Sequence, residues 1–138
     1  MLGGSNPTGG TNPSGSGTSI NYIGEHAYAY SGKIVSSQTR FTALKFSTGN
    51  RYIVGRLNFT GFIDDDQPAT RDAGMCALLI NGEESLLLAT GSDAIDATSV
   101  VYAEILLPSN SEIIVEVESV GAAADNFCTV GITGRVYG

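Results

Sequence analysis

"EIIVEVESV", residues 112–120, alternates between apolar and acidic side chains along most of its length. Successive side chains of a strand point to opposite faces of a sheet, so this period of two predicts a strand with one buried and one solvated face. The two predicted faces are Ile113, Val115 and Val117 on one side and Glu112, Glu116 and Glu118 on the other.

Two other segments alternate in the same way. Residues 51–63 predict a core face of Ile53, Gly55, Leu57, Phe59 and Ile63, with Arg56, Asn58 and Thr60 facing outward. Residues 126–137 predict a core face of Cys128, Val130, Ile132 and Val136, with Thr129, Thr133 and Arg135 facing outward. Both patterns are typical of half-buried antiparallel strands.

Turn residues separate these runs from other runs that are rich in β-forming side chains. Gly49-Asn50 lies between 38–48 and 51–63, and Asn81-Gly82 lies between 74–80 and 83–90, so each predicts a hairpin. Asn-Gly favours a type I′ turn, which needs positive φ at both central residues. Pro108-Ser109-Asn110 predicts a further turn before residue 112.

The whole pattern predicts an all-β protein with eight strands and no helix. Eight short antiparallel strands in 138 residues favour a two-sheet β-sandwich, specifically a jelly roll, over residues 20–138. An immunoglobulin-like sandwich is the alternative, and the absence of Trp disfavours it.

Residues 1–19 predict an extended N-terminal arm instead of a part of the core, because they contain no charge and no bulky apolar side chain after Leu2. Within them, "GGSNPTGGTNPSG" (3–15) repeats an Asn-Pro-Thr/Ser-Gly unit, which is the preferred chemistry of a type I turn. A flexible linker is the alternative. As an arm, it would bind a partner through Asn6, Pro7, Asn12 and Pro13.

Seven basic against fourteen acidic residues give a formal net charge of −7, which argues against nucleic acid or an anionic membrane as the partner. Six of the seven bases lie between residues 33 and 71, whereas the later part is acidic. The two parts could pair within one molecule or between copies. "MLGGSN" resembles no secretory signal, so we expect synthesis in the cytosol.

Candidate catalytic and metal-binding residues are few. His26 is the only histidine, which disfavours a nucleophile–histidine triad and a multi-histidine metal centre, so we expect no enzyme and no cofactor. Asp64, Asp65 and Asp66 are weak calcium candidates, with a solvated acidic loop as the alternative. Cys76 and Cys128 lie in apolar runs and predict two buried reduced thiols.

Three tyrosines lie close together in the sequence. Tyr28 and Tyr30 are two residues apart and therefore project from the same side of their strand, with Tyr22 nearby. Tyrosine is common both at the edge of a core and in contact surfaces. The three residues are therefore predicted partner contacts, with a core edge as the alternative.

The segments "TALKFSTGNRYIVGRLNFTGFI" (42–63) and "LLPSNSEIIVEVESVGAAADNFCTVGITGRVYG" (106–138) resemble the small jelly-roll cement, or decoration, proteins of tailed bacteriophage heads. The resemblance implies a non-enzymatic virion protein, made in the host cytoplasm, that binds the major capsid protein on the outside of the shell. It also implies a homo-oligomer, often a dimer or trimer, with a terminal arm that reaches a neighbour.

Two other functions remain open from the sequence. One is a glycan- or receptor-binding sandwich of a fibre or tail, which would use Tyr28, Tyr30 or the Asp64–Asp66 loop. The other is a self-assembling coat or filament subunit, in which the arm donates a strand to the next copy.

Overall fold

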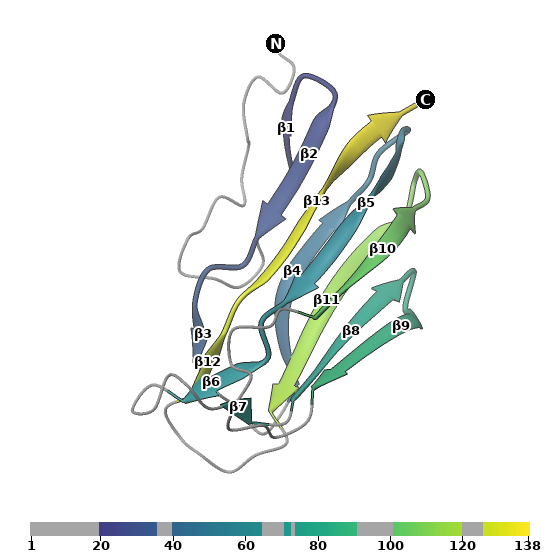
Figure 1. Ribbon diagram of the computed structural model, residues 1–138. Coiled ribbons are helices and arrows are strands. Elements are labelled where there is room, and N and C mark those ends of the chain that lie inside the picture. The colour runs from purple at the N-terminus through teal and green to yellow at the C-terminus, as the bar shows by residue number, and fades with distance from the viewer. Residues whose placement is uncertain (1–19, 36–39, 65–70, 73, 91–100, 120–125) are drawn as a thin grey trace.

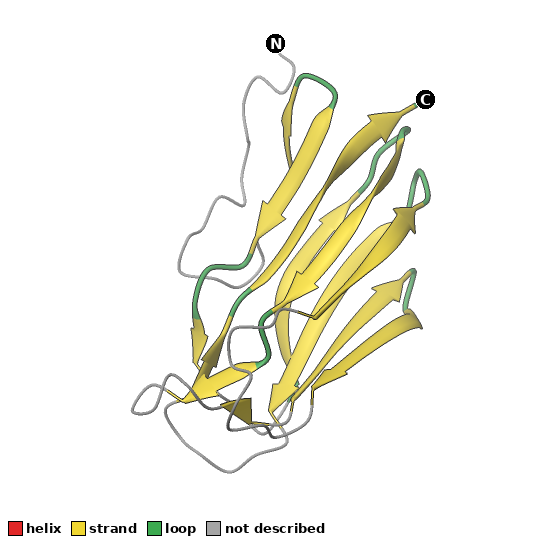
Figure 2. Cartoon of the chain, in the orientation of Figure 1, coloured by secondary structure: helices red, strands yellow, loops and turns green. Residues whose placement is uncertain are grey.

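The computed structural model describes residues 20–35, 40–64, 71–72, 74–90, 101–119 and 126–138. The described residues contain no helix, and antiparallel strands pack as a β-sandwich (Figures 1 and 2). The prediction of an all-β antiparallel sandwich is therefore confirmed.

Two sheets form the layers of the sandwich. The five-stranded sheet has the order β1-β2-β13-β5-β10, with bounds Asn21–Ile23, His26–Tyr30, Val130–Tyr137, Tyr52–Phe59 and Val101–Leu107. The four-stranded sheet has the order β4-β11-β8-β9, with bounds Phe41–Ser47, Glu112–Ser119, Gly74–Ile80 and Glu83–Thr90.

A third, short sheet lies at the end of the molecule away from the C-terminus (Figure 1). Its order is β3-β12-β6-β7, with bounds Ile34–Val35, Asn126–Cys128, Phe62–Asp64 and Arg71–Asp72. The first three of these strands repeat the order β2-β13-β5, and each adjoins the corresponding longer strand in the chain. The short sheet therefore extends the five-stranded sheet beyond a bend.

Side-chain hydroxyl groups complete the hydrogen bonding at this bend. The backbone N–H of Val130 donates to Ser31 Oγ at 3.0 Å, and the N–H of Thr129 donates to Thr60 Oγ1 at 3.0 Å. Gly32 and Gly61 both have φ of +75°, in the left-handed region that other residues rarely adopt. These glycines let two adjacent strands change direction together.

The number of strands differs from the prediction of eight. The described residues contain thirteen strands, because the predicted runs 20–36, 51–63 and 126–137 are each interrupted and β7 is additional. Gly24, Gly32 and Gly61, all with positive φ, occupy the breaks in the first two runs. The eight strands of five or more residues correspond to the eight predicted runs.

The predicted hairpin at Gly49-Asn50 is wrong. β4 pairs with β11 and β5 pairs with β13 and β10, so the turn carries the chain from one sheet to the other. Thr48 fixes this crossing: its hydroxyl donates to the Pro108 carbonyl at 2.7 Å and accepts from the Ser111 N–H at 3.0 Å. The connection from β10 to β11 also changes sheets, and these bonds hold the two crossings side by side.

The predicted Asn81-Gly82 hairpin is confirmed. β8 pairs with β9 up to Ile80 and Glu83, and the φ angles of Asn81 and Gly82 are +54° and +86°. Both central residues thus have the positive φ that a type I′ turn requires.

The core lies between the two sheets and agrees with the predicted alternation along the long strands. In 51–63 the phase changes at Gly61, because Phe62 is buried although it continues the predicted outward phase, and the side chain of Ile63 lies outside the described residues. Ile53, Leu57, Phe59, Ile113 and Val115 are completely buried. The other large contributors are Leu44, Leu78, Leu107, Val117, Val130, Ile132 and Val136. Because every second residue of the long strands enters the core, the intervening residues form the two outer faces of the sandwich.

Candidate functional site: a tyrosine face with two hollows

Five of the six tyrosines lie on the outer face of the five-stranded sheet, which we call the tyrosine face. They come from four strands and are Tyr28, Tyr30, Tyr52, Tyr102 and Tyr137. Each occupies an outward position in a strand whose alternate residues enter the core. Interfaces of proteins are enriched in tyrosine and arginine, so this face is the strongest candidate for binding a partner.

The predicted cluster of tyrosines is confirmed in part. Tyr28 and Tyr30 project from the same side of β2, with ring centroids 5.5 Å apart. Tyr22, in contrast, pairs with Ala27 on the inward side and packs against the core. Burial raises the pKa of the Tyr22 phenol, and the nearby Arg51 charge opposes this effect. Tyr22 is therefore a core-edge residue.

One end of the tyrosine face is strongly apolar. Tyr52, Val54, Leu106 and Tyr137 are each 39–56% exposed, and we call these four residues the apolar end. Tyr52 and Tyr137 are cross-strand partners whose rings stack at 5.5 Å, and Val54 pairs with Leu106. Of the ten large hydrophobic side chains exposed in the described part of the chain, seven lie on the tyrosine face.

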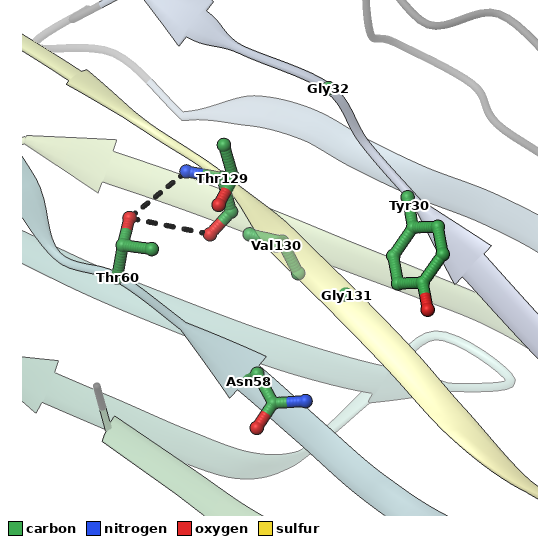
Figure 3. A pocket seen from close by; sticks show the side chains of 7 residues that line it. All are labelled: Tyr30, Gly32, Asn58, Thr60, Thr129, Val130 and Gly131. Carbon is green, nitrogen blue, oxygen red and sulfur yellow. Dashed lines mark hydrogen bonds between the residues drawn. The ribbon is translucent and has the colours of Figure 1, made fainter.

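A shallow hollow of about 280 Å³, which we call the Tyr30 hollow, lies at the other end of this face, where the strands bend (Figure 3). Tyr30, Gly131, Asn58 and Tyr102 are register partners in one row across four strands. Figure 3 shows Tyr30 and Asn58 on opposite sides of β13. The lining residues are Tyr30, Gly32, Asn58, Thr60, Thr129, Val130 and Gly131.

A second hollow, of about 290 Å³, adjoins the first and is lined by charged groups. Arg56 and Glu104 are cross-strand partners with a 3.6 Å nitrogen–oxygen distance, and the Arg56 guanidinium lies 4.4 Å from the Tyr102 ring centroid. Thr133 and Gly55 form part of the same lining. The Arg56 guanidinium thus makes both an ion pair with a carboxylate and a cation–π contact with an aromatic ring.

The outer face of the four-stranded sheet has a different character. Arg40 contacts three glutamates of this face, at 3.1 Å to Glu84, 3.1 Å to Glu116 and 3.6 Å to Glu118. Hydrogen bonds to Glu116 and then Glu84 raise the pKa of the Arg40 guanidinium. These contacts join the basic first part of the chain to the acidic second part within one molecule. We call this surface the glutamate face.

The two cysteines are buried and unpaired in the structure. Burial raises the pKa of each thiol to about 12, and the proximity of Cys128 further raises that of Cys76. Since the thiolate is the nucleophilic form, neither cysteine has the exposure or the acidity of a catalytic thiol. Their predicted burial is confirmed.

Several predicted site residues lie outside the described residues. These are Asn6, Pro7, Asn12 and Pro13 of the arm, together with Asp65 and Asp66. Asp64 ends β6, but its side chain is also outside the described part. His26 is exposed on β2, and the described residues contain no group of three or more potential metal ligands. Among them, no helix is long and apolar enough to cross a membrane.

Asn58, Tyr52, Tyr102 and Tyr137 are candidate binding residues of the structure that the sequence pattern did not indicate. Tyr52 carried a signal for its outward position, because it has the same phase as the predicted Arg56 and Asn58. A single exposed aromatic residue is ordinary, and only its neighbours in the sheet make it part of a contact surface. Tyr102 and Tyr137 join Tyr52 only because β10, β5 and β13 are neighbours in the sheet.

The chain matches no protein-family model and no curated protein. Its function is therefore inferred from the chemistry of the tyrosine face and the hollows in it.

Proposed function

We propose that this protein is a non-catalytic structural protein of a virus particle, a decoration protein that binds the outside of the capsid shell. The observation that carries this proposal is the apolar end of the tyrosine face. A contiguous exposed apolar patch on a sheet is a typical protein–protein interaction site, and its tyrosines provide large contact areas at a low cost in side-chain entropy.

The strand order supports a jelly-roll fold for this proposal. Strands β2, β13, β5 and β10 lie in one layer and β4, β11, β8 and β9 in the other. Along the chain, every connection between these eight strands changes layers except the β8–β9 hairpin. Two interleaved four-stranded sheets of this kind characterise jelly rolls, which are common in viral capsid proteins.

The arm at residues 1–19 supplies a second contact in this proposal. It precedes β1, which is an edge strand of the sheet that carries the tyrosine face. An uncharged arm with turn-forming Asn-Pro units could follow a groove on a neighbouring shell subunit. Attachment through both the arm and the apolar end would add avidity, because the second contact becomes intramolecular.

The test is co-sedimentation with expanded capsids assembled from the major capsid protein without this chain. We expect the parent protein to bind and Val54→Asp/Leu106→Asp to bind at least about tenfold more weakly, because charges would enter a desolvated contact. Leu87→Asp, at an exposed leucine of β9 in the other sheet, is the matched control and should bind like the parent.

Deletion of residues 1–19 tests the arm separately in the same assay, and unchanged binding would remove it from the proposal. Sedimentation of the free protein tests the expected dimer or trimer. If Val54→Asp/Leu106→Asp dissociates an oligomer while shell binding persists, the apolar end is a contact between copies. If the parent protein fails to bind any capsid, the decoration role is wrong.

A further inference from the structure

The Tyr30 hollow combines a supported aromatic ring with a polar amide. The ring is 54% exposed, so one part of it is open to solvent. Tyr28 supports it from within β2, with the two centroids 5.5 Å apart. On the other side lies Gly131, where an added Cβ would stand only 3.0 Å from Tyr30 Cδ1. The ring therefore lies close to the glycine and offers an exposed aromatic platform.

Asn58 lies across β13 from this platform and is partly buried. Figure 3 shows no hydrogen bond from its side chain to the other residues that line the hollow, and the amide offers two N–H donors and one carbonyl acceptor. Thr60 is different, because its hydroxyl donates to the Gly61 carbonyl at 2.9 Å and accepts from the Thr129 N–H. Asn58 is thus a polar group in the lining that has both donor and acceptor capacity for a ligand, together with the hydroxyl groups of Thr129 and Tyr30.

The hollow has no charged side chain in its lining, and its exposed surface is mainly apolar. A phosphate-bearing ligand would find no cation in the lining, and Arg56 of the second hollow already contacts Glu104 and the Tyr102 ring. An extended peptide could not enter the sheet as a strand across the hollow, because β13 already pairs with β2 on one side and with β5 on the other. These features favour a small neutral ligand with an apolar face and hydroxyl groups at its edge.

We propose that the Tyr30 hollow is a binding subsite for one neutral hexopyranose of a glycan. The C–H face of the sugar would lie on the Tyr30 ring, and two ring hydroxyls would bind the Asn58 amide, one as acceptor and one as donor. The hollow, at about 280 Å³, is just below the range of pockets for drug-sized ligands, so it suits a single sugar ring.

The proposed sugar subsite and the proposed shell contact use different residues. Asn58 lies four residues from Val54 along β5, which is roughly 13 Å at the rise of a strand. A large partner on the apolar end would also cover the hollow, so the two activities are distinguished by their residues. Variants at the two ends of the face separate the two activities.

The test is saturation-transfer difference NMR on the full chain with a panel of methyl glycosides of glucose, galactose, mannose and N-acetylglucosamine. We expect at least one glycoside to receive saturation, with a dissociation constant on the order of millimolar. Tyr30→Ala and Asn58→Ala should each reduce that signal at least fivefold. Tyr30→Phe should preserve most of it, because the phenyl ring still stacks.

Tyr52→Ala is the matched control, since it removes an exposed tyrosine of the same face outside the hollow, and its signal should equal that of the parent. Thermal melting of every variant verifies folding, and two independent sites keep the test valid if one variant unfolds. Absence of saturation transfer for the whole panel overturns the proposal, as does an unchanged signal in folded Tyr30→Ala or Asn58→Ala. The shell-binding assay is unaffected by either outcome.

Discussion

Gly55 and Gly134 are cross-strand partners in the centre of the five-stranded sheet. A Cβ at Gly55 would stand 2.1 Å from the Thr133 carbonyl oxygen and 2.6 Å from Gly134 Cα. A Cβ at Gly134 would stand 2.7 Å from the Val54 carbonyl oxygen. Because these neighbours are backbone atoms, they cannot rotate away. The two glycines let β5 and β13 approach closely beneath the tyrosine face.

We expect Gly55→Ala to destabilise the protein by about 1–3 kcal/mol, the usual cost of additional atoms in a packed site. The measurement is the free energy of unfolding in urea. Gly131→Ala is the control, since its nearest neighbour is the exposed Tyr30 ring, which can move, and its effect should stay within about 0.5 kcal/mol. Equal stabilities of Gly55→Ala and the parent would contradict the close approach.

At the scale of elements, the two predicted hairpin turns behave differently. Asn81 and Gly82 both have positive φ, and β8 and β9 remain paired around them. At Gly49-Asn50 only the glycine has positive φ, and the chain leaves its sheet. The Asn81 side chain also accepts from the Glu112 N–H at 2.9 Å and so connects the turn to the start of β11.

Asn81→Ala should lower the free energy of unfolding by about 1–2 kcal/mol. Alanine would have to adopt the left-handed conformation at this position without a side chain that can form local hydrogen bonds. The backbone N–H of Glu112 would also lose its acceptor. Asn50→Ala, in the turn between sheets, is the control and should be nearly neutral, because Asn50 is exposed and is not among the positive-φ residues. Similar losses for both variants in chemical denaturation would refute this distinction.

At the scale of the whole molecule, the two outer faces of one sandwich have separate chemistries. The tyrosine face exposes aromatic and aliphatic groups, whereas the glutamate face carries an arginine bound to three carboxylates. Exposed ion pairs contribute little to stability, so the glutamate face mainly keeps that side hydrated. Burial of apolar surface favours docking through the tyrosine face.

The buried thiols make global stability sensitive to alkaline pH. Folding raises the pKa of Cys76 and Cys128 to about 12, whereas an unfolded thiol ionises near 8.5. The folded state therefore binds these protons more tightly than the unfolded state does. The resulting contribution to the free energy of unfolding is fully present below about pH 8 and is lost as pH rises toward 12. At pH 10.5 the loss is on the order of 2 kcal/mol for each cysteine.

Urea unfolding in reductant at pH 7.5 and pH 10.5 measures this loss. Cys76→Ala/Cys128→Ala should be less stable than the parent at pH 7.5, because two cavities are created, but should lose less stability between the two pH values. All other ionisable groups are the same in both proteins, so their effects cancel in the comparison. The same pH dependence in both proteins would show that the thiols are not the cause.

The sequence alone determined the all-β class, the inward and outward phases of the long strands, and the Asn81-Gly82 hairpin. These features are local, since a period of two places each residue of 112–119 or 130–137 on a face whatever strand lies beside it. The outward positions of Tyr28 and Tyr30 follow from the same rule.

Only the tertiary structure decided which strands became neighbours. β2, β13, β5 and β10 come from distant parts of the chain, and their pairing brings Tyr30, Asn58 and Tyr102 into one row. The sequence did not predict that Gly49-Asn50 changes sheets, because Thr48 obtains its partners from Pro108 and Ser111, 60 or more residues away. Long-range strand pairing depends on the packing of the complete core, and so the candidate site exists only in the folded chain.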